Sequence, residues 1–167
     1  MQLSPEHRYF LVLHQGIVPS GFNLVLNGLI AWLLFRSASS IPLWGESGMG
    51  IDLLATAFLL PFLTCLIVSR LVGGQVRAGK LSPLPERQVP QVGWSHRPVL
   101  TRGLLLGAGG VLLGAIPLLI ALSLGNAQPF AVGSFIGFKA AWAALLAAVA
   151  TPIVGWWALA HASREPA

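Results

Sequence analysis

Four polar side chains lie inside long apolar stretches of this sequence: Asn23, Asn27, Asp52 and Lys139. A charged group within a membrane is costly, so it usually pairs with another group or takes part in binding, ion passage or proton transfer. Because a helix rises by a fixed distance per residue, counting along each stretch places the four side chains at overlapping depths. We therefore predict that they form a substrate-binding or ion-binding site in the outer half of the bilayer.

Each of these side chains also has an interpretation that involves no ligand. Asp52 would stabilise a helix N-terminus, where a negative charge complements the helix dipole. Lys139 would extend its apolar stem toward the membrane surface. Asn23 and Asn27 would hydrogen-bond to a neighbouring helix, as polar side chains do in membrane bundles. The sequence leaves these alternatives open, including whether Asp52 and Lys139 pair.

Small residues form stripes on two of the apolar stretches. Steps of three and four residues connect the members of a stripe, so each stripe lies on one helix face. Small side chains let helix backbones approach closely in lipid. We predict helix-packing seams that consist of Gly16, Ser20, Gly103, Gly107, Gly110 and Gly114. The glycine-rich seam also favours self-association, so we expect a homo-oligomer or a membrane-protein partner.

Enzymatic arrangements are absent from the sequence. It contains no nucleophile elbow, no glycine-rich phosphate loop after a strand and no histidine pair with metal-ligand spacing. We therefore predict a protein that is not an enzyme and that carries no metal or cofactor. His14 is expected to be a buried structural residue, and the single cysteine, Cys65, excludes an intrachain disulfide.

The elements that must position these residues are four apolar stretches, 10–35, 50–72, 99–124 and 130–160. Each reaches the roughly 20 residues that a helix needs to cross a bilayer. Of the 167 residues, 55% are hydrophobic and 9% are charged, whereas soluble domains carry about a quarter charged residues. The fold class predicted is therefore an all-α integral membrane protein with four transmembrane helices.

The basic residues indicate the orientation of these helices. The net charge is +5, and most lysines and arginines lie near the termini or in and beside the segment 76–98. By the positive-inside rule both termini and this segment are cytoplasmic, and we expect a bacterial inner (plasma) membrane. The charge thus needs no nucleic-acid partner. Anionic lipid is the expected partner of four residues in this region: Arg77, Lys80, Arg87 and Arg97.

The predicted organisation is a transmembrane hairpin at 1–75, a basic proline-rich loop at 76–98 and a second transmembrane hairpin at 99–167. We expect the loop to be an extended charged tether. A shift of 87 residues places Asp52 on Lys139 and Gly16 on Gly103, although the identities overall are few. This alignment favours a parallel internal repeat about an axis along the membrane normal.

Two classes of function fit these observations. The first is a small oligomeric transporter or channel-like protein whose polar site lies within the membrane. The alternative is a non-catalytic accessory or assembly subunit that docks on a larger membrane complex through its seams and its basic loop. In both, the lipid bilayer surrounds the helices.

Overall fold

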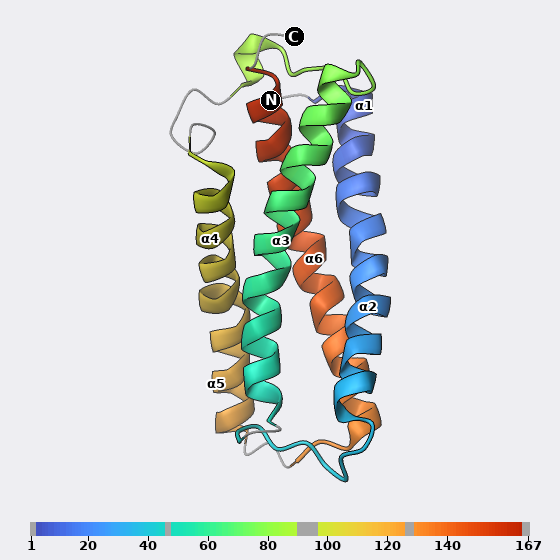
Figure 1. Ribbon diagram of the computed structural model, residues 1–167, viewed down its shortest axis with the longest axis vertical. Helices are drawn as coiled ribbons and strands as arrows, with labels where there is room; N and C mark the ends of the chain where they lie inside the picture. The colour runs from blue at the N-terminus through green and yellow to red at the C-terminus, as the bar shows by residue number, and fades with distance from the viewer. Residues whose placement is uncertain (1–2, 46–47, 90–96, 126–128, 165–167) are drawn as a thin grey trace.

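The computed structural model describes residues 3–45, 48–89, 97–125 and 129–164. Four of its helices are long and apolar enough to cross a membrane: Pro5–Phe35, Met49–Arg77, Val99–Leu124 and Val132–Ala162. The prediction of an all-α protein with four such helices is confirmed, and their length and composition indicate an integral membrane protein. Figure 1 shows them side by side in one elongated bundle.

Two of the four helices are divided into segments. The first consists of α1 (Pro5–Tyr9), a π-helical segment η1 (Phe10–Ile17) and α2 (Val18–Phe35). The third consists of α4 (Val99–Gly110), a π-helical segment η3 (Val111–Ala115) and α5 (Ile116–Leu124). The other two are continuous: α3 (Met49–Arg77) and α6 (Val132–Ala162). A short 3₁₀ turn, η2 (Glu86–Gln88), follows α3.

Prolines explain the positions of the two π-helical segments. Pro19 and Pro117 each occupy the second residue of the α-helix that follows a π segment. A proline has no backbone N–H to donate, and its ring crowds the carbonyl one turn earlier. A local i→i+5 pattern absorbs both effects without breaking the helix. The π segment also changes which side chains face the rest of the bundle.

Helix α6 lies at the centre of the packing. It contacts α2 on one side and α3 on another, and α3 in turn contacts α4 (Figure 1). Half of its most apolar window is buried, compared with 11% for the first helix. Alanines such as Ala143 and Ala147, both fully buried, allow this close approach. The main helix–helix contacts therefore join the first predicted hairpin to the second.

The start of α1 and the end of α6 lie at the same end of the bundle, where the connection from α3 toward α4 begins (Figure 1). That connection begins as an anchored strap. Leu81 and Leu84 are buried in a cluster with Phe10, Val72 and Leu159. The prediction of an extended tether is therefore wrong for residues 81–84. Burial of the two leucine side chains removes apolar surface from water, and this holds the segment on the bundle.

Hydrogen bonds hold this strap against both ends of the chain. The backbone N–H and the hydroxyl of Ser82 donate to the Glu6 carboxylate, and the backbone N–H of Leu84 donates to Ser163 Oγ over 2.8 Å. At the other end of the bundle, Ile41 and Phe130 exchange two backbone hydrogen bonds of 2.9 Å. These bonds join the connection between α2 and α3 to the connection between α5 and α6, beside the first turn of α3.

Candidate functional site

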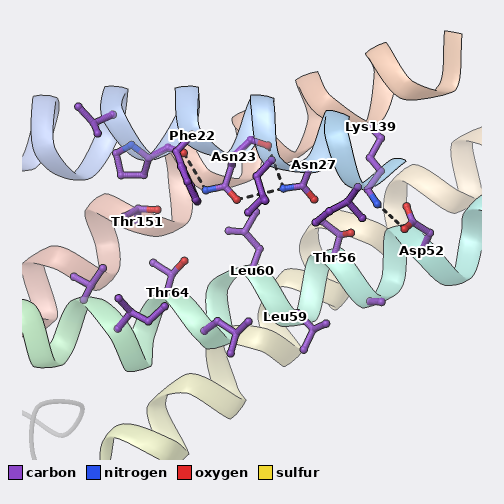
Figure 2. Close-up of a pocket in the computed structure, with 18 residues that line it drawn as sticks. Phe22, Asn23, Asn27, Asp52, Thr56, Leu59, Leu60, Thr64, Lys139 and Thr151 are labelled. Atoms are coloured by element: carbon purple, nitrogen blue, oxygen red, sulfur yellow. Dashed lines mark hydrogen bonds and ion pairs between the residues drawn. The ribbon is translucent and has the colours of Figure 1, made fainter. Parts of the chain in front are cut away.

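A groove of about 610 Å³ runs between α2 and α3, with α6 contributing two residues to its lining. We name it the α2–α3 groove (Figure 2). Its lining comprises Val18, Pro19, Phe22, Asn23, Leu26, Asn27, Ile30, Asp52, Ala55, Thr56, Leu59, Leu60, Leu63, Thr64, Ile67, Val68, Lys139 and Thr151. The structure thus brings together all four residues of the predicted site, Asn23, Asn27, Asp52 and Lys139.

An ion pair forms one end of this groove. Lys139 Nζ donates to Asp52 Oδ1 over 2.5 Å, and the side chains are 1% and 13% exposed. The charge of Lys139 is therefore neutralised by a carboxylate of the chain, inside the bundle. Asp52 lies in the first turn of α3, where the helix dipole adds to the stabilisation of its charge.

The ion pair leaves hydrogen-bonding capacity unused. Asp52 Oδ2 is buried and accepts no hydrogen bond from the described residues. A carboxylate can accept several hydrogen bonds, and an ammonium group can donate three. A buried acceptor without a hydrogen bond lowers the stability of the fold, and a hydrogen bond from a donor removes this cost. This end of the groove can therefore accept a hydrogen bond from a further group.

The two asparagines hydrogen-bond within their own helix. Asn23 Nδ2 donates to the carbonyl of Pro19 over 2.9 Å, and Asn27 Nδ2 donates to the carbonyl of Asn23 over 3.1 Å. The interpretation that they bond to a neighbouring helix is therefore wrong for this chain. Asn27 Nδ2 also lies 3.3 Å from Asn23 Oδ1, whereas no described residue donates to Asn27 Oδ1. Figure 2 shows both amides in the middle of the groove, facing Leu60.

Three threonines of the groove were not among the predicted site residues. Thr56 and Thr64 come from α3, and Thr151 comes from α6. Thr151 Oγ1 is buried and has no hydrogen-bond partner among the described residues. The sequence did carry one signal, because Thr64 and Thr151 are separated by the same 87 residues as Asp52 and Lys139. A hydroxyl can pair with its own helix, so a threonine alone did not indicate a site.

Three glycines of the third helix, Gly103, Gly107 and Gly110, face α3. A Cβ atom added at Gly103 or Gly107 would lie 3.1 or 2.9 Å from a phenylalanine ring of α3. At Gly110 it would clash with the carbonyl oxygen of Ala57. Helix α3 therefore covers this seam within the chain, so an association of two copies would need another surface.

The remaining seam residues are packed less closely. A Cβ atom at Gly114 would lie 3.6 Å from Leu146 of α6, and one at Gly16 would lie 4.0 Å from Pro152 of α6. Ser20 Oγ donates to the carbonyl of Gly16 over 2.7 Å, within the same helix. Gly16 thus faces α6 at an ordinary contact distance.

The prediction for His14 is wrong. His14 is exposed and lies edge-on to Tyr9, with ring centroids 5.4 Å apart. Its neighbour Gln15 is buried against Gly155, and Gln15 Oε1 has no hydrogen-bond partner among the described residues. Both residues lie in the π segment η1, where the face that meets the bundle departs from the regular helical period.

The predicted lipid-binding residues lie at the end that carries the termini. Arg77 lines a cavity between α3, α4 and α6, whereas Lys80, Arg87 and Arg97 are exposed. Within the described ranges, no three side chains of histidine, cysteine, aspartate or glutamate gather as metal ligands. Comparisons of the chain with protein-family models, with curated proteins and with solved structures gave no match.

Proposed function

We propose that this protein is a small membrane transporter that takes an amphipathic molecule from the bilayer into the α2–α3 groove. The observation that carries the proposal is the meeting of three features in one groove of about 610 Å³. These are apolar walls, an ion pair with a free acceptor at one end, and a rim open to the surroundings of the helices. Pockets for small molecules span about 300–1,000 Å³.

The rim of the groove supports entry from the side. Leu59, Leu63 and Ile67 of α3 are 47%, 46% and 56% exposed, and Phe22 of α2 is 64% exposed. In a bilayer these side chains contact lipid tails, so an apolar chain can move between lipid and groove without crossing water. A permeating metal ion would instead need several oxygen ligands around it, and most of this lining is apolar.

The polar atoms of the groove define the head of the molecule. Asp52 Oδ2 and Asn27 Oδ1 are acceptors that receive no hydrogen bond from the described residues. Lys139 already donates to Asp52. A ligand that completes these groups must bring hydrogen-bond donors, as an amine or a hydroxyl group does. The substrate class proposed is therefore an amphiphile with a donor-bearing head and an apolar chain.

A pair of amphiphiles tests this proposal. Dodecylamine has N–H donors, whereas dodecyltrimethylammonium has the same chain and charge without them. We expect dodecylamine, but not dodecyltrimethylammonium, to raise the unfolding temperature of the purified protein. We also expect labelled dodecylamine to cross the membrane of proteoliposomes that contain the protein.

Thr56→Trp fills the groove, and Leu113→Trp, at a residue that is 84% exposed, is the matched control. Both responses should disappear in Thr56→Trp and persist in Leu113→Trp. Equal responses to the two amphiphiles, or a full response in Thr56→Trp, would contradict the proposal.

An accessory subunit is the second candidate, and the exposure of the first helix favours it. Only 11% of the most apolar window of that helix is buried, so a partner helix has room to cover the groove from the side. Gentle purification followed by mass spectrometry distinguishes the two functions. A protein that accompanies the wild type and Leu113→Trp, but not Thr56→Trp, would favour the accessory function.

The packing pattern supports an internal repeat, which we include in the proposal. Exchanging the two hairpins preserves the contacts of α6 with α2, of α3 with α4 and of α3 with α6. Asp52 and Lys139 are 87 residues apart and form the ion pair. Gln15 and Arg102 have the same separation, and both are buried with unpaired polar atoms. Two equivalent residues meet in the way that Asp52 and Lys139 do when they lie at a twofold axis.

The orientation and the assembly are also proposals. The end with the termini carries most of the basic residues, which supports a cytoplasmic location in a bacterial inner membrane. Assembly into oligomers would use the exposed face of α2, where Val25 and Leu29 are 67% and 50% exposed. Cysteine accessibility at exposed residues of each end would test the orientation.

A further inference from the structure

Arg102 is a buried cation for which the described residues supply no counterion. It lies one turn into α4 and is 2% exposed. Its Nε and Nη2 atoms are buried and have no hydrogen-bond partner among the described residues. Arginine keeps its charge in proteins, so this arrangement lowers the stability of the fold unless an anion neutralises the guanidinium.

Arg102 lines a cavity of about 180 Å³ between α3, α4 and α6. Cys65, Ser69, Leu106, Ile153, Val154 and Trp157 complete its lining. A second cavity of about 430 Å³ also includes Ser69, and it is lined further by Arg70, Arg77 and His161. Among the described residues, no aspartate or glutamate lines either cavity. The described lining of the two cavities therefore supplies cationic side chains and no carboxylate.

We propose that Arg102 binds a phosphate group in the cavity of about 180 Å³. We name this cavity the Arg102 cavity. The two atoms without partners, Nε and Nη2, donate from one edge of the guanidinium plane. Two parallel N–H groups on that edge match two oxygens of a phosphate in a bidentate pair. The arginines of the adjoining cavity add positive charge on the side from which a phosphate would enter.

The site is separate from the α2–α3 groove. Arg102 lies near the end of the bundle that carries the termini, whereas Asp52 lies near the other end (Figure 1). The phosphate belongs either to the headgroup of a phospholipid or to a soluble phosphate compound. Leu100, which lines the adjoining cavity and is 56% exposed, provides apolar surface for the tail of a lipid.

Thermal unfolding of the delipidated full chain, in neutral detergent without phosphate, tests the site. The probes are inorganic phosphate, dioleoylphosphatidylglycerol and dioleoylglycerol, the last of which has the same tails without a phosphate. We expect a saturable rise in the unfolding temperature with at least one of the first two. Arg102→Met should abolish the rise, and Arg102→Lys should weaken the apparent affinity by roughly tenfold or more, since an ammonium group lacks the two-pronged geometry.

Arg8→Gln is the matched control, because Arg8 is exposed in α1 near the same end of the bundle and loses the same charge. It should respond as the wild type does. A response to phosphatidylglycerol alone identifies the lipid as the source, and a response to inorganic phosphate identifies a soluble compound; both support the site. An equal effect of dioleoylglycerol, no wild-type response, or a full response in Arg102→Lys would overturn it. If Arg102→Met does not fold, Arg102→Lys decides.

Discussion

Lys139 and Arg102 are two buried cations that the fold treats differently. Lys139 of α6 is 1% exposed and pairs with Asp52 of α3. Arg102 of α4 is 2% exposed, and two of its nitrogen atoms have no partner within the described ranges. Both cations border a hollow between helices, the α2–α3 groove for Lys139 and the Arg102 cavity for Arg102.

The difference shows what each charge can do. A cation that has its counterion within the chain is part of the folded structure, and removing either partner leaves a buried charge. A cation without a counterion has its full charge available to a ligand, but its burial lowers the stability of the bundle. The ion pair therefore fixes how α3 meets α6, whereas Arg102 is suited to binding.

The largest effect is expected where the internal pair is broken. Asp52→Asn keeps the shape of the side chain but leaves the Lys139 charge unpaired, so we expect a loss of about 3–5 kcal/mol of stability. The double variant Asp52→Asn with Lys139→Met should recover most of it, because no charge remains buried. Thermal unfolding in detergent measures both. If Asp52→Asn unfolds at the temperature of the wild type, the pair does not stabilise the fold.

Substitution of Arg102 should change the stability in the opposite direction in the same measurement. Without phosphate or phospholipid, Arg102→Met removes a charge for which the described residues supply no counterion. The variant should therefore be as stable as the wild type, or more stable by up to about 4 kcal/mol. Thermal unfolding of the delipidated proteins checks this. A large loss of stability in Arg102→Met, comparable with that of Asp52→Asn, would remove the contrast between the two cations.

The sequence was sufficient to predict the four helices, which follow from the length of the apolar stretches. The fixed rise of a helix also predicted overlapping heights for Asn23, Asn27, Asp52 and Lys139. These four residues do line one groove. Depth alone did not reveal that the amide nitrogens of the asparagines bond within α2.

The neighbours of each helix could not be predicted in the same way. Short connections favour packing between consecutive helices, yet α2 packs mainly on α6. The π segments η1 and η3 also change the side-chain faces, so Gln15 is buried where His14 was expected. Arg102 follows the start of α4 by a few residues, and at that position a basic residue usually reaches the membrane surface. Its burial depends on contacts between three helices.

A smaller effect is expected from the glycine that holds α4 on α3. At Gly110 an added Cβ would meet the carbonyl oxygen of Ala57, whereas at Gly109 it would meet nothing within 4 Å. Gly110→Ala should cost about 1–3 kcal/mol through overpacking and should weaken the phosphate response at the Arg102 cavity. Gly109→Ala, the matched control, should leave thermal unfolding and phosphate binding unchanged. Equal stability of the two variants would show that α4 shifts freely on α3.

The smallest effect is expected when the internal pair is reversed. Asp52→Lys combined with Lys139→Asp restores an ion pair between α3 and α6, so the double variant should recover most of the stability that either single change removes. Recovery should fall short by about 0.3–1 kcal/mol, because a lysine in the first turn of α3 opposes the helix dipole that now favours Asp52. Residue 139 lies farther into α6, which begins at Val132, so an aspartate there gains little in exchange. Thermal unfolding of the four proteins gives the coupling energy. A double variant no more stable than the single ones would show that the pair depends on its direction, and the twofold relation between the hairpins would then lose its strongest support.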